Sequence, residues 1–185
     1  MSFKRLQKKT RKVHRYVSLI VSVQLLLWTI SGLYFSFAKI ENVRGEQYLI
    51  EQSNAETQAQ TELISQEDAF DAVKNQTILL PKQIELIEEQ MAGSEYRGRN
   101  LPLYKVVTED ENGKKINAYL NPYNGELVAL RSTQWRIWDW MWGVHIMDWV
   151  ERDRIDNIFL KVFSILALVS LLSGGVLFIR KCRSD

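Results

Sequence analysis

The chain has two histidines, His14 and His145, and each lies beside a long apolar segment. A neutral imidazole can ligate haem iron through one ring nitrogen. Both histidines are therefore candidate ligands of haem iron, and we expect no other metal to bind them. Trp142 is a candidate wall of a haem pocket. The alternative interpretation is structural: His14 contacts lipid phosphates, and His145 packs within an interfacial aromatic cluster.

Other chemistry has no recognisable motif in the sequence. GxSxG, HExxH, the Walker loop and GxGxxG are all absent, so we predict no catalytic residues. The single cysteine, Cys182, excludes a disulfide, a thiolate zinc site, an iron–sulfur cluster and covalent haem attachment within this chain, and leaves palmitoylation as its alternative role. We expect an accessory protein more than an enzyme.

Two apolar segments predict membrane-spanning helices. Segment 16–38 contains no charged residue, and segment 158–179 contains only Lys161, close to an end where its stem can reach the interface. At about 1.5 Å per residue, each segment covers a hydrocarbon layer of about 30 Å. A cleavable signal peptide is the alternative for the first segment, but that segment is longer than such peptides require and lacks a small-residue cleavage site.

The charges beside these segments predict an orientation. Residues 1–15 include seven Lys or Arg and residues 180–185 include three, so we expect both termini on the cytoplasmic side of a bacterial inner membrane. Residues 40–157 have 12 Lys and Arg against 21 Asp and Glu, a formal charge of −9. We expect this acidic part to be periplasmic and not to bind nucleic acid, and the basic N-terminal tail to contact anionic lipids of the bilayer.

The acidic part predicts a small mixed domain. Segment 39–61 is polar without an apolar period and is interpreted as a connector or a marginal helix. Ser65, with Asp68 three residues later, predicts the capped start of a short amphipathic helix. Alternating or β-rich runs separated by Gly-containing turns predict an antiparallel sheet. Its strands are 83–88, 103–108, 116–120 and 126–130, with turns at 111–113 and 121–125.

Segment 132–152 has an unusual aromatic pattern. Trp138, Trp142, His145 and Trp149 follow at i, i+4, i+7 and i+11, and would share one face of a helix. Because tryptophan favours the headgroup region, we expect this helix to lie along the exported surface of the membrane. Its interfacial residues would be Trp135, Trp138 and Trp149.

The segments ISQEDAFDAV, PLYKVV and ENGKKINAYLNPYNGELVAL resemble the PepSY domain, a helix packed on a small antiparallel sheet. The most specific part is the strand, turn and strand from Ala118 to Leu130, in which Asn121 replaces the commoner aspartate of the family's turn. The flanking segments resemble membrane PepSY proteins, which carry histidines beside spans that contain Ser-Gly. The matching residues are His14, Arg15, Tyr16, Ser31, Gly32, Trp142, His145, Ser173 and Gly174.

The resemblance implies an α+β membrane protein in which two transmembrane helices flank a small exported PepSY-like domain and an interfacial Trp-rich helix. PepSY modules occur in peptidase pro-regions, in inhibitors and in ferric-siderophore reductase-like membrane proteins, so the fold alone does not decide the function. The expected parts are a cytoplasmic tail 1–15, span 16–38, connector 39–61, domain 62–131, helix 132–152, span 158–179 and tail 180–185.

Two functions remain open. The first is a non-hydrolytic accessory subunit that supports transmembrane electron transfer or metal handling, with haem bound between chains. His14 and His145 are expected at opposite membrane faces, so they cannot ligate one haem together, and a homo-oligomer or a partner in a membrane complex must supply the second ligand. The second is a periplasmic interaction or inhibitor module that restrains an exported enzyme or a membrane complex.

Small polar residues in both spans predict a helix contact, either between the two spans or with a partner, since small residues and weak hydrogen bonds stabilise helix association in membranes. These residues are Gln24, Trp28, Ser31 and Gly32 in the first span, and Ser170, Ser173 and Gly174 in the second.

Overall fold

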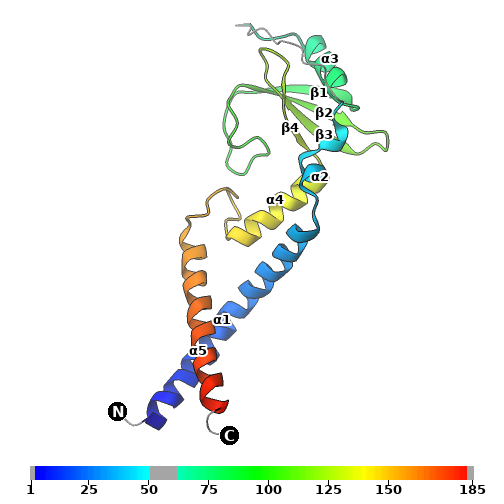
Figure 1. The fold of residues 1–185 in the computed structure, drawn as a ribbon. Coiled ribbons are helices and arrows are strands. Elements are labelled where there is room, and N and C mark those ends of the chain that lie inside the picture. The colour runs from blue at the N-terminus through cyan, green and yellow to red at the C-terminus, as the bar shows by residue number, and fades with distance from the viewer. Residues whose placement is uncertain (1–2, 51–61, 183–185) are drawn as a thin grey trace. The chain divides into compact units, whose positions relative to one another are not determined.

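A computed structural model of the protein describes residues 3–50 and 62–182 (Figure 1). The chain forms two compact units: a membrane unit, residues 1–36 and 141–185, and a sheet domain, residues 37–140. The elements in chain order are α1 Phe3–Phe37, α2 Ile40–Arg44, η1 Glu46–Tyr48, α3 Gln66–Gln76, β1 Leu80–Ile87, β2 Leu103–Glu109, β3 Lys115–Leu120, β4 Leu127–Arg131, α4 Thr133–Ile146 and α5 Ile158–Cys182.

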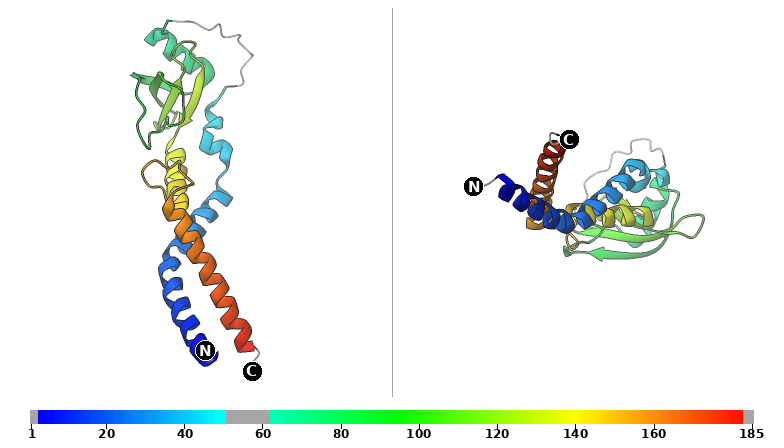
Figure 2. Two further views of the ribbon diagram at one scale, coloured as in Figure 1. Left: turned by 90° about the vertical axis from the view of Figure 1, so that its left-hand side faces the viewer. Right: turned by 90° about the horizontal axis from the view of Figure 1, so that it is seen from below.

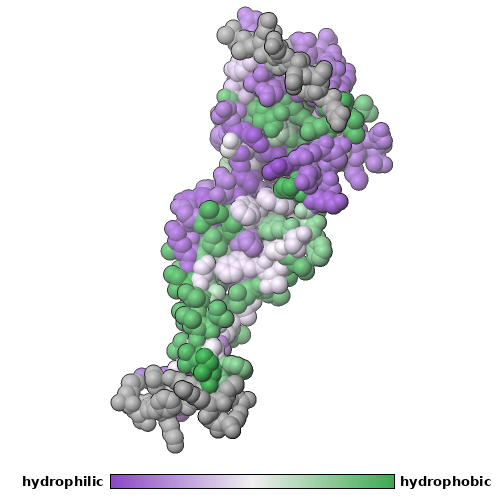
Figure 3. Space-filling view, in the orientation of Figure 1, coloured by the Kyte–Doolittle hydropathy of each residue, from purple (hydrophilic) through white to green (hydrophobic). Residues whose placement is uncertain are grey.

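The membrane unit contains two helices that are long and apolar enough to cross a bilayer, Lys8–Phe37 within α1 and Ile158–Ile179 within α5. Their surface is largely hydrophobic (Figure 3). The two helices are antiparallel, so the start of α1 and the end of α5 lie at the same end of the unit (Figure 2). The Ser18 and Ser170 hydroxyl oxygens are 2.7 Å apart across the seam. The residues predicted on α5 do contact α1, but their partners there are His14 and Ser18. Of the residues predicted on the first span, Trp28 and Ser31 instead contact His145 of α4.

The sheet domain is a four-stranded antiparallel sheet in the order β1-β2-β3-β4, with α3 on one face. Val106 of β2 lies opposite Ala118 of β3, which lies opposite Leu130 of β4. These residues and Val73 of α3 are buried in one apolar core. Burial of such side chains is the main stabilising contribution to a small domain. The predicted α+β fold is confirmed.

The second face of the sheet is covered by the long β1–β2 loop, residues 88–102, for which the sequence predicted no element. Tyr96 from this loop packs with Leu103, Tyr119 and Ala129, which point away from α3. The Tyr96 and Tyr119 ring centroids are 5.9 Å apart. The sheet therefore has a core on both faces, and the neighbouring residues Leu103 and Tyr104 of β2 are buried on opposite faces.

The predicted start of α3 is confirmed. The Asp68 backbone N–H donates to Ser65 Oγ at 3.1 Å, and the Ser65 backbone N–H donates to Asp68 Oδ2 at 3.4 Å, which together form a capping box. Gly125, in the predicted turn after β3, has a φ of 69° and approaches α3 closely. A Cβ atom at this position would lie 3.0 Å from the Cβ atom of Ala72, so the turn requires glycine here.

The predicted connector is partly helical. Residues 40–44 form α2 and residues 46–48 form η1, and the backbone of Tyr48 accepts a hydrogen bond from the Ile78 N–H at 3.0 Å. This part of the connector therefore packs on the sheet domain. Residues 51–61 of the predicted connector lie outside the described residues.

The Trp-rich helix is shorter than predicted, because α4 ends at Ile146 and not near residue 152. Met147 has a φ of 56°, a left-handed conformation that ends the helix. Trp149 consequently lies in the loop after α4, where its ring centroid is 6.3 Å from that of Phe159. The prediction that Trp149 shares a helical face with Trp142 and His145 is wrong, since periodicity along the chain does not reveal where the backbone turns.

Candidate functional site

His14 lies in the seam between α1 and α5. Its Nδ1 atom is 2.9 Å from Ser173 Oγ, and Ser173 Oγ is 3.0 Å from the carbonyl oxygen of Ser170. The Ser18 hydroxyl oxygen is also 3.3 Å from Nδ1. A serine hydroxyl has one proton, which is donated either to a carbonyl oxygen of its own helix or to the imidazole. When Ser173 donates to the Ser170 carbonyl, it can accept a hydrogen bond from a protonated Nδ1 of His14.

Gly174 provides the space for the His14 ring. A Cβ atom at Gly174 would lie 3.0 Å from His14 Cε1, whereas a Cβ atom at the neighbouring Gly175 would meet no atom within 4 Å. A larger side chain at position 174 would therefore displace the imidazole.

His145 lies near the end of α4 and is held by α1. Ser31 Oγ donates to the carbonyl oxygen of Leu27 at 2.8 Å, and is 2.8 Å from His145 Nδ1. As at His14, a serine hydroxyl that donates to its own helix can accept a hydrogen bond from Nδ1 of the histidine. The Trp28 indole N–H also donates to the backbone carbonyl oxygen of His145 at 2.7 Å, which fixes the backbone beneath the ring.

Both histidines thus have the same surroundings, in which Nδ1 lies beside a serine hydroxyl that also contacts a carbonyl oxygen of its own helix. Among the described residues, none forms a hydrogen bond with either Nε2 atom. An imidazole that ligates a metal normally has this arrangement, in which one nitrogen donates to an outer partner while the other binds the ion. The sequence had predicted Ser31 and Ser173 as helix-packing residues and did not reveal this second role.

The two histidines are far apart along the membrane unit. His145 contacts Ser31, which follows His14 on α1 by 17 residues, a rise of about 25 Å. One haem cannot be ligated by both histidines of one chain.

An open cavity of about 560 Å³ adjoins His14. Leu19 and Leu177 supply apolar walls, and Arg11 and Arg15 supply positive charge. The ring of His14 is partly buried in the helix seam and partly faces this cavity. The remaining lining residues are Ser18 and Ser22.

Aromatic rings surround His145. The Trp142 ring is nearly parallel to the imidazole, with centroids 6.4 Å apart and an interplanar angle of 15°. The Phe35 ring meets the imidazole edge-on at 5.6 Å. Trp142 therefore orients His145, and its role as a wall of a haem pocket stays a prediction.

Trp135 lies in the sheet domain, where arginines approach its ring. The guanidinium carbon of Arg131 is 4.3 Å from the ring centroid and that of Arg97 is 5.7 Å away, which indicates cation–π contacts. The pKa of Arg131 is lowered to about 10 by burial and by the nearby charge of Arg99. The interfacial placement of Trp135 and Trp138 at lipid headgroups stays a prediction.

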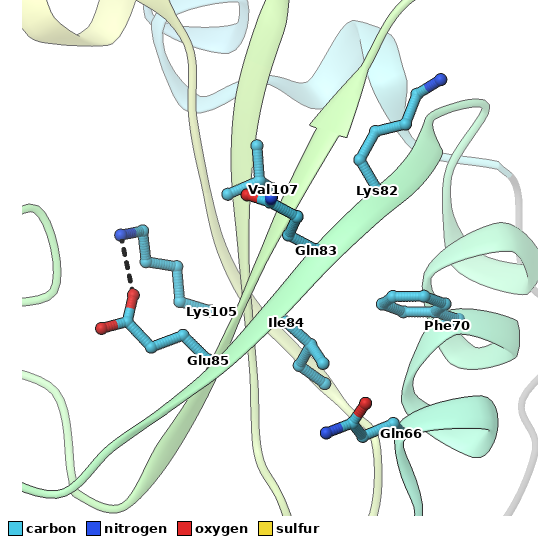
Figure 4. A pocket seen from close by; sticks show the side chains of 8 residues that line it. All are labelled: Gln66, Phe70, Lys82, Gln83, Ile84, Glu85, Lys105 and Val107. Carbon is cyan, nitrogen blue, oxygen red and sulfur yellow. Dashed lines mark hydrogen bonds and ion pairs between the residues drawn. The ribbon is translucent and has the colours of Figure 1, made fainter.

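A pocket of about 520 Å³ lies at the exposed edge of the sheet, between α3 and β1 (Figure 4). Phe70 of α3 and Ile84 of β1 supply apolar surface, and Lys105 is paired with Glu85 at 3.2 Å. The edge strand also contains Pro81 and a bulge directly after it. Proline, bulges and charges obstruct the pairing of an additional strand, so this edge is poorly suited to adding a peptide strand.

A family described as PepSY-associated TM region has a model that matches residues 5–185. The chain belongs to this family. Neither a curated protein nor a solved structure matches the chain. The PepSY-associated TM membership confirms the resemblance read from the sequence, and it identifies the chain as a membrane-anchored PepSY accessory protein.

The loop after α4 in this PepSY-associated TM protein is organised by Asp148. The Asp148 carboxylate accepts hydrogen bonds from the backbone N–H groups of Glu151, Asp153 and Arg154, with N···O distances of 3.1–3.2 Å. Burial opposes ionisation of Asp148, but these hydrogen bonds outweigh it and hold the pKa of the carboxyl below its ordinary value of 3.8.

We predict that Asp148 stabilises the loop at neutral pH and ceases to do so in acid. Because the pKa is lower in the folded state, the stabilisation is complete above about pH 4 and disappears as the pH falls through the folded-state value. Asp148→Ala should lower the thermal stability of the full chain at pH 7 and have little effect near pH 2. Asp156→Ala, which removes a carboxylate that is 73% exposed, is the matched control. Equal effects of Asp148→Ala at both pH values would contradict the prediction.

Proposed function

We propose that this PepSY-associated TM protein is a haem-binding subunit for electron transfer across the membrane. The observation that carries the proposal is the shared environment of His14 and His145: each Nδ1 atom lies 2.8–2.9 Å from a serine hydroxyl oxygen, and each Nε2 atom has no hydrogen bond from the described residues. A neutral imidazole held in this way is pre-organised as an axial iron ligand.

His14 and His145 would each hold a separate haem. Since one chain offers one histidine at each position, the second axial ligand comes from another copy of the chain or from a partner subunit. Bound haem supplies one-electron redox chemistry. Ser173 and Ser31 fix the ring orientations and increase the basicity of Nε2 by accepting the Nδ1 protons.

The orientation of the chain in the membrane is part of the same proposal. The basic residues beside both spans favour an inner-membrane protein with both termini in the cytoplasm and the sheet domain in the periplasm. The haem at His14 then lies near the cytoplasmic face and the haem at His145 lies toward the periplasmic face, so that electrons can pass between compartments.

The test is the absorption spectrum of the full chain, purified in detergent after expression with haem supplied. We expect a Soret band in the oligomeric form, loss of about half of the haem in His14→Ala or His145→Ala, and loss of nearly all of it in the double variant. Ser36→Ala, an exposed change on α1, is the control and should retain the haem. An oligomer without a Soret band would disprove the proposal. A stoichiometric partner protein that still co-purifies with the double variant would favour the interaction module.

A further inference from the structure

We propose that Arg11 and Arg15 bind the carboxylates of the haem whose iron is held by His14. This inference rests on the proposed function and assigns the orientation of that haem, which neither the family nor the histidines determine. The cavity beside His14 is lined by both arginines.

The spacing of the three residues places them together. Arg11, His14 and Arg15 lie at i, i+3 and i+4 on α1, so their side chains project from one face of the helix. Arg11 lies one turn before His14, toward the end of the helix at which the span begins, and Arg15 directly follows His14.

The two arginines have positive charges without carboxylate partners among the described residues. Each of the other arginines and lysines with an ion pair in the structure lies in the sheet domain or in the loop after α4. Arg11 and Arg15 are exposed at the rim of the cavity and available to a ligand. Guanidinium groups form short, charge-assisted and often paired hydrogen bonds with carboxylates.

The cavity combines positive charge with apolar surface. Leu19 of α1 and Leu177 of α5 line it together with Ser18, Ser22 and the two arginines. A ligand that suits this lining has an apolar surface and an anionic edge. Haem has this form, with an apolar macrocycle and two carboxylates on one edge.

An anionic phospholipid shares this chemistry, so the test must separate the two ligands. Haemin and haemin dimethyl ester, which lacks both negative charges, are titrated into haem-free full chain carrying His145→Ala, so that only the His14 site reports. The titration is performed in neutral detergent and in nanodiscs that contain phosphatidylglycerol.

We expect Arg11→Gln and Arg15→Gln each to weaken haemin binding about tenfold, the usual size of a lost charge-assisted hydrogen bond. Binding of the dimethyl ester should be weak and the same in all variants. Arg15→Lys, which keeps the positive charge, should bind haemin more tightly than Arg15→Gln does. Lys8→Gln and Lys12→Gln are matched controls, because these exposed cations lie on the same helix but do not line the cavity. Circular dichroism verifies that each variant is folded.

Three results would overturn the inference while leaving haem binding intact. The first is equal haemin affinity in the arginine variants and the parent. The second is an equal loss in the lysine controls, which would show a general effect of charge. The third is loss of co-purified phosphatidylglycerol, but not of haemin affinity, in the arginine variants, which would identify a lipid site. Absence of haemin binding from the His14 site of the parent would instead contradict the proposed function.

Discussion

Replacing Asp139 by alanine is expected to lower the free energy of unfolding of the sheet domain by about 3–5 kcal/mol. The Asp139 side chain is 3% exposed and forms an ion pair with Arg97. Its removal would leave the Arg97 guanidinium, 17% exposed, close to the buried charge of Arg131. Removing one partner of a buried pair is costly because the other charge stays out of water.

The measurement is hydrogen exchange of the β2 and β3 amides in the full chain, which reports the opening of the sheet domain by itself. Asp71→Ala is the matched control, since Asp71 and its partner Lys74 are 66% and 54% exposed. An exposed pair of this kind contributes about 0.5 kcal/mol or less. If Asp139→Ala changed amide protection no more than Asp71→Ala, the pair would not stabilise the domain.

Replacing Gly174 by leucine is expected to separate α1 from α5 around His14. The first added carbon would already lie 3.0 Å from the imidazole, and the rest of the leucine would occupy the space of the ring. Overpacking of this kind costs about 1–3 kcal/mol. The hydrogen bond between His14 and Ser173 and the contact between Ser18 and Ser170 should be lost together.

The measurement is crosslinking of Ser18→Cys to Ser170→Cys by a short bifunctional thiol reagent, in a chain that also carries Cys182→Ser. The two serine oxygens are 2.7 Å apart, so the cysteines should react within one chain. Gly174→Leu should lower the yield about 5- to 30-fold, as expected for a shift of 1–2 kcal/mol. Gly175→Leu is the control, because a Cβ atom at position 175 would have no other atom within 4 Å. An undiminished yield in Gly174→Leu would show that the helices do not depend on this close approach.

These experiments address contacts that the sequence could not reveal. His14 and Ser173 are 159 residues apart, and Ser31 and His145 are 114 residues apart. A hydroxyl four residues after a histidine, as in Ser18, is a weak signal by itself, since serines in membrane helices usually bond to their own backbone. The protonation of Nδ1 follows only when the partner of each serine hydroxyl is known.

The sequence by itself determined the features that arise from local patterns: the apolar spans, the capping box at Ser65, the strands and turns of the sheet, and the family. Apolar length, alternation and turn residues act over a few neighbouring positions and are therefore readable along the chain. The tertiary structure decided the end of α4 at Ile146, the cover that Tyr96 gives to the second face of the sheet, and the serine partners of both histidines. These depend on groups that meet only when distant segments pack together.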